Sequence, residues 1–196
     1  AHPYLTMDFQ FEANIVRTLA KIIDRGHLHR GSKPVHWCLD CGSALAEAEV
    51  EYADKQSSAI DVAFPFVDRA EAASRLGCDD GEPIELAIWT TTPWTLPANR
   101  AVALSADLDY VLLDLGGRRV LVAEALAAEC AQRFGAERHE IVGLAKGAAL
   151  EGLSVMPPFG EAPVPIVLGE HVTTEAGTGC VHTAPAHGLE DFDMGQ

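Results

Sequence analysis

The sequence predicts a β-rich α+β fold, a β-barrel-like domain with peripheral helices. Most of its apolar stretches are short and end at Gly, Pro or Asp, which is the pattern of many short strands. Helical periodicity is confined to a few segments that do not alternate regularly with the strands, and this disfavours a doubly wound parallel sheet. A chain of 196 residues with 48% hydrophobic residues can bury a core, so one main domain is expected.

The first predicted element is a helix over residues 11–25. Its apolar residues recur at helical spacing, and Gly26 is suited to end the helix. The apolar stripe consists of Phe11, Ile15, Leu19, Ile22 and Ile23. We assign residues 1–36 to an N-terminal connecting segment that contains this helix, and residues 37–196 to the main domain. Because the chain does not begin with Met, we expect it to be part of a longer protein.

Strands and turns dominate the rest of the chain. Residues 84–90 form an apolar run that ends before Pro93 and Pro97, which do not fit a central strand. Two further runs flank Gly116-Gly117 and predict a β-hairpin with a two-residue turn. The other predicted elements are strands over 59–64, 110–115, 118–122, 164–168 and 180–183, and a helix over 124–134 that ends at Gly135.

Charge and cysteine content exclude several classes of protein. The formal net charge is -15, so the chain lacks the basic surface that holds nucleic acid through its phosphates, and we expect no DNA partner. No stretch approaches the ~20 apolar residues of a membrane-spanning helix, and we expect no membrane association. The five cysteines are irregularly spaced, which argues against a secreted disulfide framework and favours a cytoplasmic location.

Two cysteines, Cys38 and Cys41, are separated by two residues and followed by Gly42, as in one half of a zinc knuckle. A structural zinc needs four ligands. His36 is a candidate for the third, and no second cysteine pair follows in this chain. A thioredoxin-type redox pair lacks its strand and helix context. The alternative is a turn that carries two free thiols.

Two segments that join apolar strands to clusters of polar groups are the candidate active-site loops, residues 89–99 and 177–192. They supply hydroxyls, two histidines and a carboxylate, without an obvious nucleophile–base pair. This combination suits a pocket that binds a small polar substrate and leaves the attack to water. Alternation along a strand turns at least one of three consecutive threonines, residues 90–92, inward. The candidate residues are Thr91, Thr92, Trp94, Thr95, Asn99, Gly177, Thr178, Gly179, His182 and Asp191.

The spacing of His182, His187 and Asp191 is similar to that of zinc hydrolases. However, Pro185 lies between the two histidines and disfavours the shared helical face that such a motif requires, so we expect no metal in the pocket. His187 is as well explained by a structural role in the turn before Gly188. Asp191 follows at the expected start of a helix, where a carboxylate can pair with a substrate ammonium group.

The same loops carry a resemblance to a known family. Residues 91–99, Thr-Thr-Pro-Trp-Thr-Leu-Pro-Ala-Asn, and residues 182–188, His-Thr-Ala-Pro-Ala-His-Gly, resemble the editing (CP1) insertion of bacterial-type isoleucyl-tRNA synthetases. The valyl and leucyl members usually have Arg-Pro-Glu or Arg-Pro-Asp in the first segment. Residues 3–9 and 34–38 are similar to the same enzymes, so the likeness covers nearly the whole chain. We expect the family domain to continue past Gln196.

The resemblance implies a β-barrel-like editing domain that hydrolyses valine misattached to the tRNA for isoleucine, and it leaves open whether valyl-adenylate is hydrolysed as well. A binding pocket resolves one methylene by only ~1–3 kcal/mol, and isoleucine against valine in this enzyme is the standard example of that limit. The implied partners are the 3′ end of the misacylated tRNA and the rest of the parent synthetase. No cofactor is implied in the editing site, whereas a structural zinc at Cys38 and Cys41 needs ligands from outside this chain.

The resemblance also implies roles for the candidate residues. Asp191 holds the α-ammonium group, and His182 with three threonines, Thr91, Thr92 and Thr95, limits the size of the side-chain pocket. Of these, we assign Asp191, Thr92 and His182 to catalysis and the remaining candidates to substrate binding. Asn99 bonds the terminal adenosine or stabilises its loop, and backbone donors of residues 177–179 are candidates for oxyanion stabilisation.

Other functions fit parts of the same sequence. A non-catalytic module that binds the tRNA end, or a zinc-stabilised connector, keeps the cysteine pair and the barrel-like fold but does not require Asp191. A free-standing deacylase is less favoured because the N-terminus resembles an internal cut.

Overall fold

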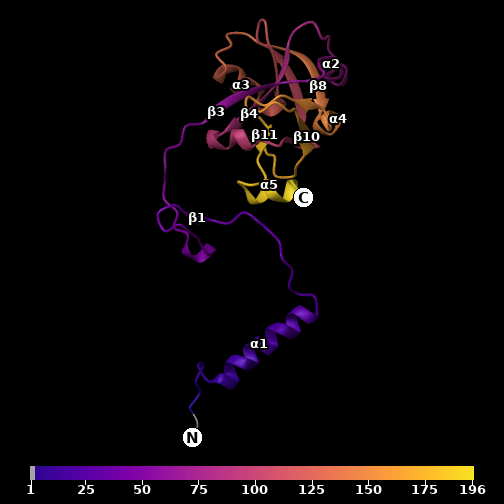
Figure 1. The fold of residues 1–196 in the computed structure, drawn as a ribbon. Helices are drawn as coiled ribbons and strands as arrows, with labels where there is room; N and C mark the ends of the chain where they lie inside the picture. The colour runs from indigo at the N-terminus through magenta and orange to yellow at the C-terminus, as the bar shows by residue number, and fades with distance from the viewer. Residues whose placement is uncertain (1–2) are drawn as a thin grey trace. The chain divides into compact units, whose positions relative to one another are not determined.

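The computed structural model describes residues 3–196, which divide into two compact units (Figure 1). One unit reaches to Lys33 and the other runs from Pro34 to Gln196. The predicted division at residue 36 lies close to this boundary, and the assignment of the two parts as connecting segment and editing domain stays a prediction.

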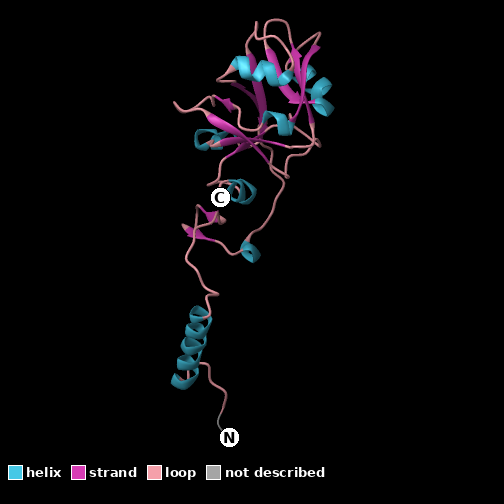
Figure 2. Cartoon of the chain, turned by 90° about the vertical axis from the view of Figure 1, so that its right-hand side faces the viewer, coloured by secondary structure: helices cyan, strands magenta, loops and turns pink. Residues whose placement is uncertain are grey.

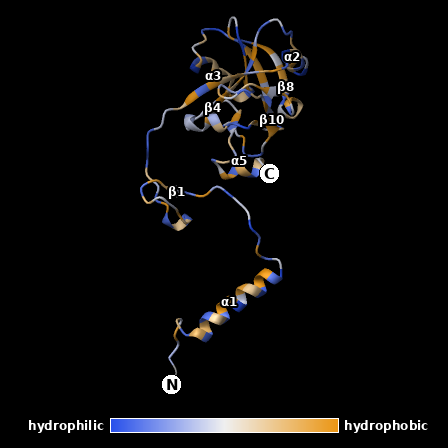
Figure 3. Ribbon diagram, viewed as in Figure 1, coloured by the Kyte–Doolittle hydropathy of each residue, from blue (hydrophilic) through white to orange (hydrophobic). Residues whose placement is uncertain are grey.

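The first unit contains helix α1, Phe9–Asp24. The Asp8 side chain accepts hydrogen bonds from the backbone N–H groups of Gln10 and Phe11, which caps the N-terminus of the helix. Gly26 adopts a positive φ of 75° just after its C-terminus. The helix starts two residues earlier than predicted, because the Asp8 cap precedes the apolar stripe. Figure 3 shows apolar and polar residues alternating along this helix, none of whose side chains is buried.

The second unit is built on strands (Figure 2). A five-stranded sheet has the order β3-β4-β7-β6-β8, and a four-stranded sheet has the order β11-β5-β10-β9. The larger sheet contains β3 Ile60–Pro65, β4 Ile84–Thr90, β6 Asp109–Asp114, β7 Arg119–Ala123 and β8 Glu140–Lys146. The smaller sheet contains β5 Ala101–Leu104, β9 Ser154–Val155, β10 Val164–Leu168 and β11 Val181–Thr183. Within residues 3–196 the two sheets are open and do not form one closed barrel.

Short helices surround the strands. They are α2 Arg69–Leu76, α3 Ala127–Arg133, α4 Gly147–Leu150, α5 Leu189–Met194 and the 3₁₀ helices η1 Glu47–Glu49, η2 Pro93–Ala98 and η3 Glu124–Leu126. The predicted helix over residues 124–134 is thus divided into η3 and α3. A separate small ribbon pairs β1 Trp37–Cys38 with β2 Ser43–Ala44. The predicted fold class, a strand-rich α+β domain with peripheral helices, is confirmed.

The core lies between the sheets and the helices. Its largest fully buried side chains include Phe64, Leu86, Tyr110 and Leu121. The predicted hairpin is formed by β6 and β7, which pair antiparallel around Gly116 and Gly117. Both glycines have positive φ, 82° and 105°, which a two-residue hairpin turn requires.

The elements that were not predicted include α2, β5 and β8. Strand β8 contains Gly143 and ends at Lys146, so its residues resemble a loop. Gly143 is needed because a Cβ there would lie 3.0 Å from the backbone O of Leu76 in α2. Strand β5 is only four residues long but wholly buried, and it lies between β10 and β11.

Candidate functional site

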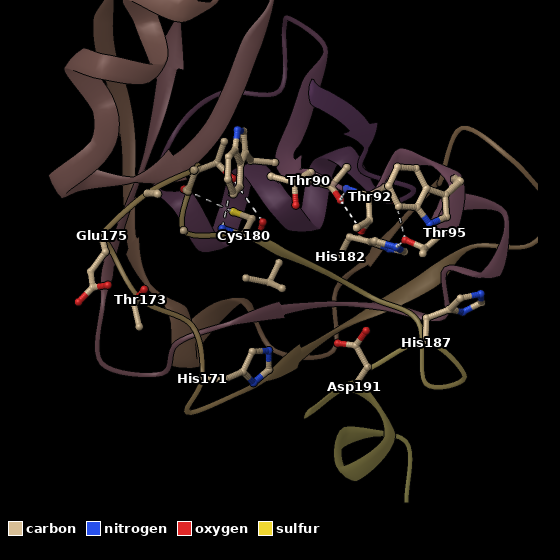
Figure 4. A pocket seen from close by; sticks show the side chains of 18 residues that line it. Thr90, Thr92, Thr95, His171, Thr173, Glu175, Cys180, His182, His187 and Asp191 are labelled. Atoms are coloured by element: carbon tan, nitrogen blue, oxygen red, sulfur yellow. Dashed lines mark hydrogen bonds between the residues drawn. The ribbon is translucent and has the colours of Figure 1, made fainter. Parts of the chain in front are cut away.

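A cleft of about 550 Å³ opens where β4, η2, β11 and α5 meet (Figure 4). The predicted residues that line it are Thr91, Thr92, Trp94, Thr95, Gly177, Thr178, Gly179, His182 and Asp191. The structure therefore brings together two segments that lie about 80 residues apart in the sequence. Asn99 does not line the cleft but contacts His182 from behind. The roles assigned to these residues stay predictions.

Trp89 and Thr90, at the start of the first predicted loop, also line the cleft. Lining residues outside the two predicted loops include His171, Thr173 and Glu175. These three belong to the segment between β10 and the Gly177-Thr178-Gly179 turn, which carries no motif of its own. The presence of polar side chains at His171, Thr173 and Glu175, just before a Gly-rich turn, was the available signal.

His182, on β11, is held by two hydrogen bonds. Its Nδ1 lies 2.6 Å from Nδ2 of Asn99, and its Nε2 lies 2.9 Å from Oγ1 of Thr95. An amide nitrogen can only donate, so Nδ1 accepts and the proton is on Nε2, which donates to Thr95. The Thr95 hydroxyl in turn donates to the backbone O of Thr92 at 2.9 Å.

This arrangement fixes both the tautomer and the charge of His182. Burial lowers the pKa of His182, with a further lowering from His187 and an opposing effect of Asp191. The ring is therefore neutral at neutral pH. Because both ring nitrogens are engaged, His182 presents the cleft with a fixed, uncharged surface and no free lone pair.

The threonine run forms a tight turn at the end of β4. The Thr90 side chain is buried, and its Oγ1 accepts a hydrogen bond of 3.0 Å from the backbone N of Thr92. The Thr90 and Thr92 hydroxyls lie 3.3 Å apart. The inward hydroxyl predicted from strand alternation is thus that of Thr90. Trp94, 68% exposed, lies at the rim.

Asp191 lies in the first turn of α5. Its Oδ2 accepts a hydrogen bond of 3.1 Å from the backbone N of Ala184, which fixes the carboxylate. Oδ1 has no partner among the described residues, and Figure 4 shows the carboxylate directed into the cleft. One oxygen positions the group and the other is free for a cationic ligand.

The Cys38 turn has the local geometry of a zinc knuckle. The backbone N of Cys41 donates to Sγ of Cys38 at 3.3 Å, and Gly42 follows with φ 62°. This bond from the backbone of Cys41, together with a hydrogen bond from the Cys41 side chain, lowers the pKa of the Cys38 thiol. The two thiols fit one half of a zinc site. No group of three or more His, Cys, Asp and Glu side chains that could hold a metal occurs within residues 3–196.

Comparison with known proteins identifies the family. The model of the class I tRNA synthetases (I, L, M and V) matches residues 1–176. The chain belongs to the class I tRNA synthetases. It is 62% identical over 199 residues to the isoleucine–tRNA ligase of Alcanivorax borkumensis, and 58% identical over 202 residues to that of Aeromonas hydrophila. Each match covers all of this chain but 21% of the relative, so the chain spans about a fifth of these class I synthetases.

Solved structures show the same fold within this family. GlLeuRS-CP1 aligns with a TM-score of 0.61 and 16% identity, covering 70% of this chain and 59% of that one. The editing domain of the P. knowlesi cytosolic leucyl-tRNA synthetase aligns with a TM-score of 0.57 and 11% identity, covering 73% and 64%. The class I synthetase chain thus has the fold of CP1 editing domains. None of the helices described here is both long and apolar enough to cross a membrane.

Proposed function

We propose that this chain is the editing domain of an isoleucyl-tRNA synthetase and that it hydrolyses valine misattached to the tRNA for isoleucine. The observation that carries the proposal is that Asp191 and His182 line the same cleft. Asp191 offers an anchored carboxylate with one free oxygen, and His182 offers a locked neutral surface. An aminoacyl ester presents an ammonium group and a side chain of defined size, which match these two features.

The ester is attacked by water in this proposal. The nearby thiol of Cys180 is unsuited as a nucleophile because its burial raises the pKa and keeps it protonated. His182 is unsuited as a general base because both of its ring nitrogens already make hydrogen bonds. The hydroxyls of Thr90 and Thr92 line the same cleft as Asp191, and they can orient a water molecule for attack on an ester bound there by its ammonium group.

Selectivity follows from the size of the cleft. Isoleucine and valine differ by one methylene, and the aminoacylation pocket alone resolves them by ~1–3 kcal/mol, the limit for which isoleucyl-tRNA synthetase is the standard example. A second pocket that rejects the larger side chain adds the missing discrimination. The fixed ring of His182 and the methyl groups of Thr92 and Thr95 supply a rigid boundary for that pocket.

A direct assay tests the proposal. We expect the full-length synthetase to release valine from valyl-tRNA(Ile) much faster than isoleucine from isoleucyl-tRNA(Ile). Release of labelled amino acid from each purified ester measures the two rates. Equal rates of release would contradict the proposed selectivity. Binding of the tRNA 3′ end without release would instead indicate a non-catalytic module that binds the tRNA end.

Deacylation is expected to need no metal in the cleft. The engaged nitrogens of His182 leave no lone pair for a metal, and Pro185 keeps His187 out of a shared helical face. Treatment with a chelator should therefore leave the deacylation of valyl-tRNA(Ile) unchanged. Aminoacylation is assayed on the same sample, because a structural zinc elsewhere would affect it separately. Loss of deacylation alone, restored by zinc, would place a metal in the cleft.

A further inference from the structure

The Gly177-Thr178-Gly179 turn is held by its carbonyl groups. The O of Thr178 accepts from the backbone N of Ala123 at 2.8 Å, and the O of Gly179 accepts from the hydroxyl of Tyr110 at 2.7 Å. The O of Gly177 accepts from Nη2 of Arg133 at 3.0 Å and from Sγ of Cys130 at 3.4 Å. All three carbonyls therefore point toward the core and α3.

The orientation of the carbonyls determines that of the amides. In a trans peptide the C=O of one residue and the N–H of the next point in opposite directions. The N–H groups of Thr178 and Gly179 thus point away from α3 and from Ala123. Both residues line the cleft and are buried, and their N–H groups have no partner among the described residues. Buried backbone donors are rarely left unpaired, so these two are suited to bind a ligand oxygen.

Arg133, the last residue of α3, makes a charged contact with this turn. Its Nε and Nη2 both bond the carboxylate of Asp61 on β3 at 2.8 Å, and its Nη1 bonds Glu129 at 3.0 Å. Nη2 also bonds Gly177 O, so the ion pair with Asp61 fixes the guanidinium where it holds the turn. Neither Arg133 nor Asp61 lines the cleft.

We propose that Arg133 is a positioning residue for the proposed deacylation. It holds the carbonyl of Gly177, and through the planar peptides of the turn it aims the N–H groups of Thr178 and Gly179 at the ester oxygen on which negative charge develops. This inference rests on the proposed function. Cys130, a weak thiol donor at 3.4 Å, does not replace a charged donor. Lysine lacks the planar fork by which one guanidinium bonds Asp61 at two points and Gly177 at the same time.

The test compares Arg133→Met and Arg133→Lys with a matched control. Arg75 on α2 is the control because it also pairs with a glutamate one turn away, Glu71, and also donates to backbone carbonyls, those of Ala149 and Glu151. Arg75 does not line the cleft. Each variant is introduced into the full-length synthetase, and kcat and KM are measured for deacylation of valyl-tRNA(Ile).

We expect Arg133→Met to lower kcat by about tenfold to a hundredfold, since a ~1 Å misplacement can cost about that much. KM should change little, because the ammonium contact is at Asp191, and Arg133→Lys should recover little of the loss. Arg75→Met should leave kcat unchanged. An unchanged kcat in Arg133→Met, a loss confined to KM, or an equal loss in Arg75→Met overturns the proposal.

A second readout does not depend on activity. The amide chemical shifts of Thr178 and Gly179, measured by NMR on the 15N-labelled 196-residue chain, should move in Arg133→Met while those of α2 stay unchanged. Unmoved shifts at the turn overturn the positioning role even if the wild type deacylates. If the shifts move but the wild-type synthetase does not deacylate valyl-tRNA(Ile), the proposed function fails, whereas the effect of Arg133 on the position of the turn stands.

Discussion

We expect replacement of Asp191 by alanine to abolish deacylation of valyl-tRNA(Ile) and to leave isoleucine activation intact. This is the largest effect we expect from any single substitution in the cleft. The variant loses the charge-assisted bond to the substrate ammonium, and the ester is then no longer held in one position against the water. We expect the rate to fall by at least ~10²-fold, the scale of a lost positioning contact.

Two further variants make the Asp191 result specific. The carboxylate also accepts from the backbone N of Ala184, so alanine loses a structural bond together with the charge. Asp191→Asn retains an oxygen for that bond and removes only the charge, and it should be nearly as inactive. Asp193→Asn, on the exposed side of the same helix, should deacylate normally. Near-normal deacylation by Asp191→Asn would remove the carboxylate charge from the mechanism.

The second large effect is a change of selectivity in His182→Ala. Removal of the imidazole enlarges the cleft where the ring is fixed by Asn99 and Thr95, so the extra methylene of isoleucine fits. We expect isoleucyl-tRNA(Ile) to be hydrolysed measurably faster than by wild type, and valyl-tRNA(Ile) to be affected less. Asp191 still holds the ammonium group, so the ester reaches water in the same place.

Folding must be controlled in this variant. Loss of the ring removes one hydrogen bond from the Asn99 amide and one from the Thr95 hydroxyl, which keep their bonds to the backbone O atoms of Ala101 and Thr92. Each lost bond costs about 0.5–1.5 kcal/mol. Circular dichroism and thermal unfolding establish that the mutant is folded before rates are compared. An equal loss of both activities in a folded mutant would assign His182 a bracing role on β11, and unchanged rejection of isoleucine would refute the steric role.

The sequence predicted those parts of the fold whose signals are local. Strand β4 has the bounds predicted for it because an apolar run is followed by Pro93, and the hairpin is as predicted because Gly116 and Gly117 supply the positive φ of its turn. Strand β8 was missed because the close approach of α2, which is far away in the sequence, requires a glycine at position 143. Local propensity cannot show such a requirement.

In the candidate site, too, only the local features could be predicted. The two loops could be located from their motifs. The hydrogen bonds that fix the His182 ring could not, since Asn99 and Thr95 lie 83 and 87 residues from it. From the sequence, Asn99 was predicted to bond the terminal adenosine or to stabilise its own loop. In the structure its amide donates to His182 and to the backbone O of Ala101. The contact of Arg133 with the backbone O of Gly177 could not be predicted either, because a helix-terminal arginine is most often a solvent-exposed charge.

Asp191 and His182 differ in how far along the chain their hydrogen-bond partners lie. Asp191 is anchored by Ala184, seven residues away, whereas the ring of His182 depends on partners brought in across the sheet and η2. Under the proposed function, we expect conditions that loosen the packing between strands to release the boundary of the pocket before the Asp191 carboxylate. A partly loosened domain would then hydrolyse correctly charged tRNA in excess rather than let valine into protein.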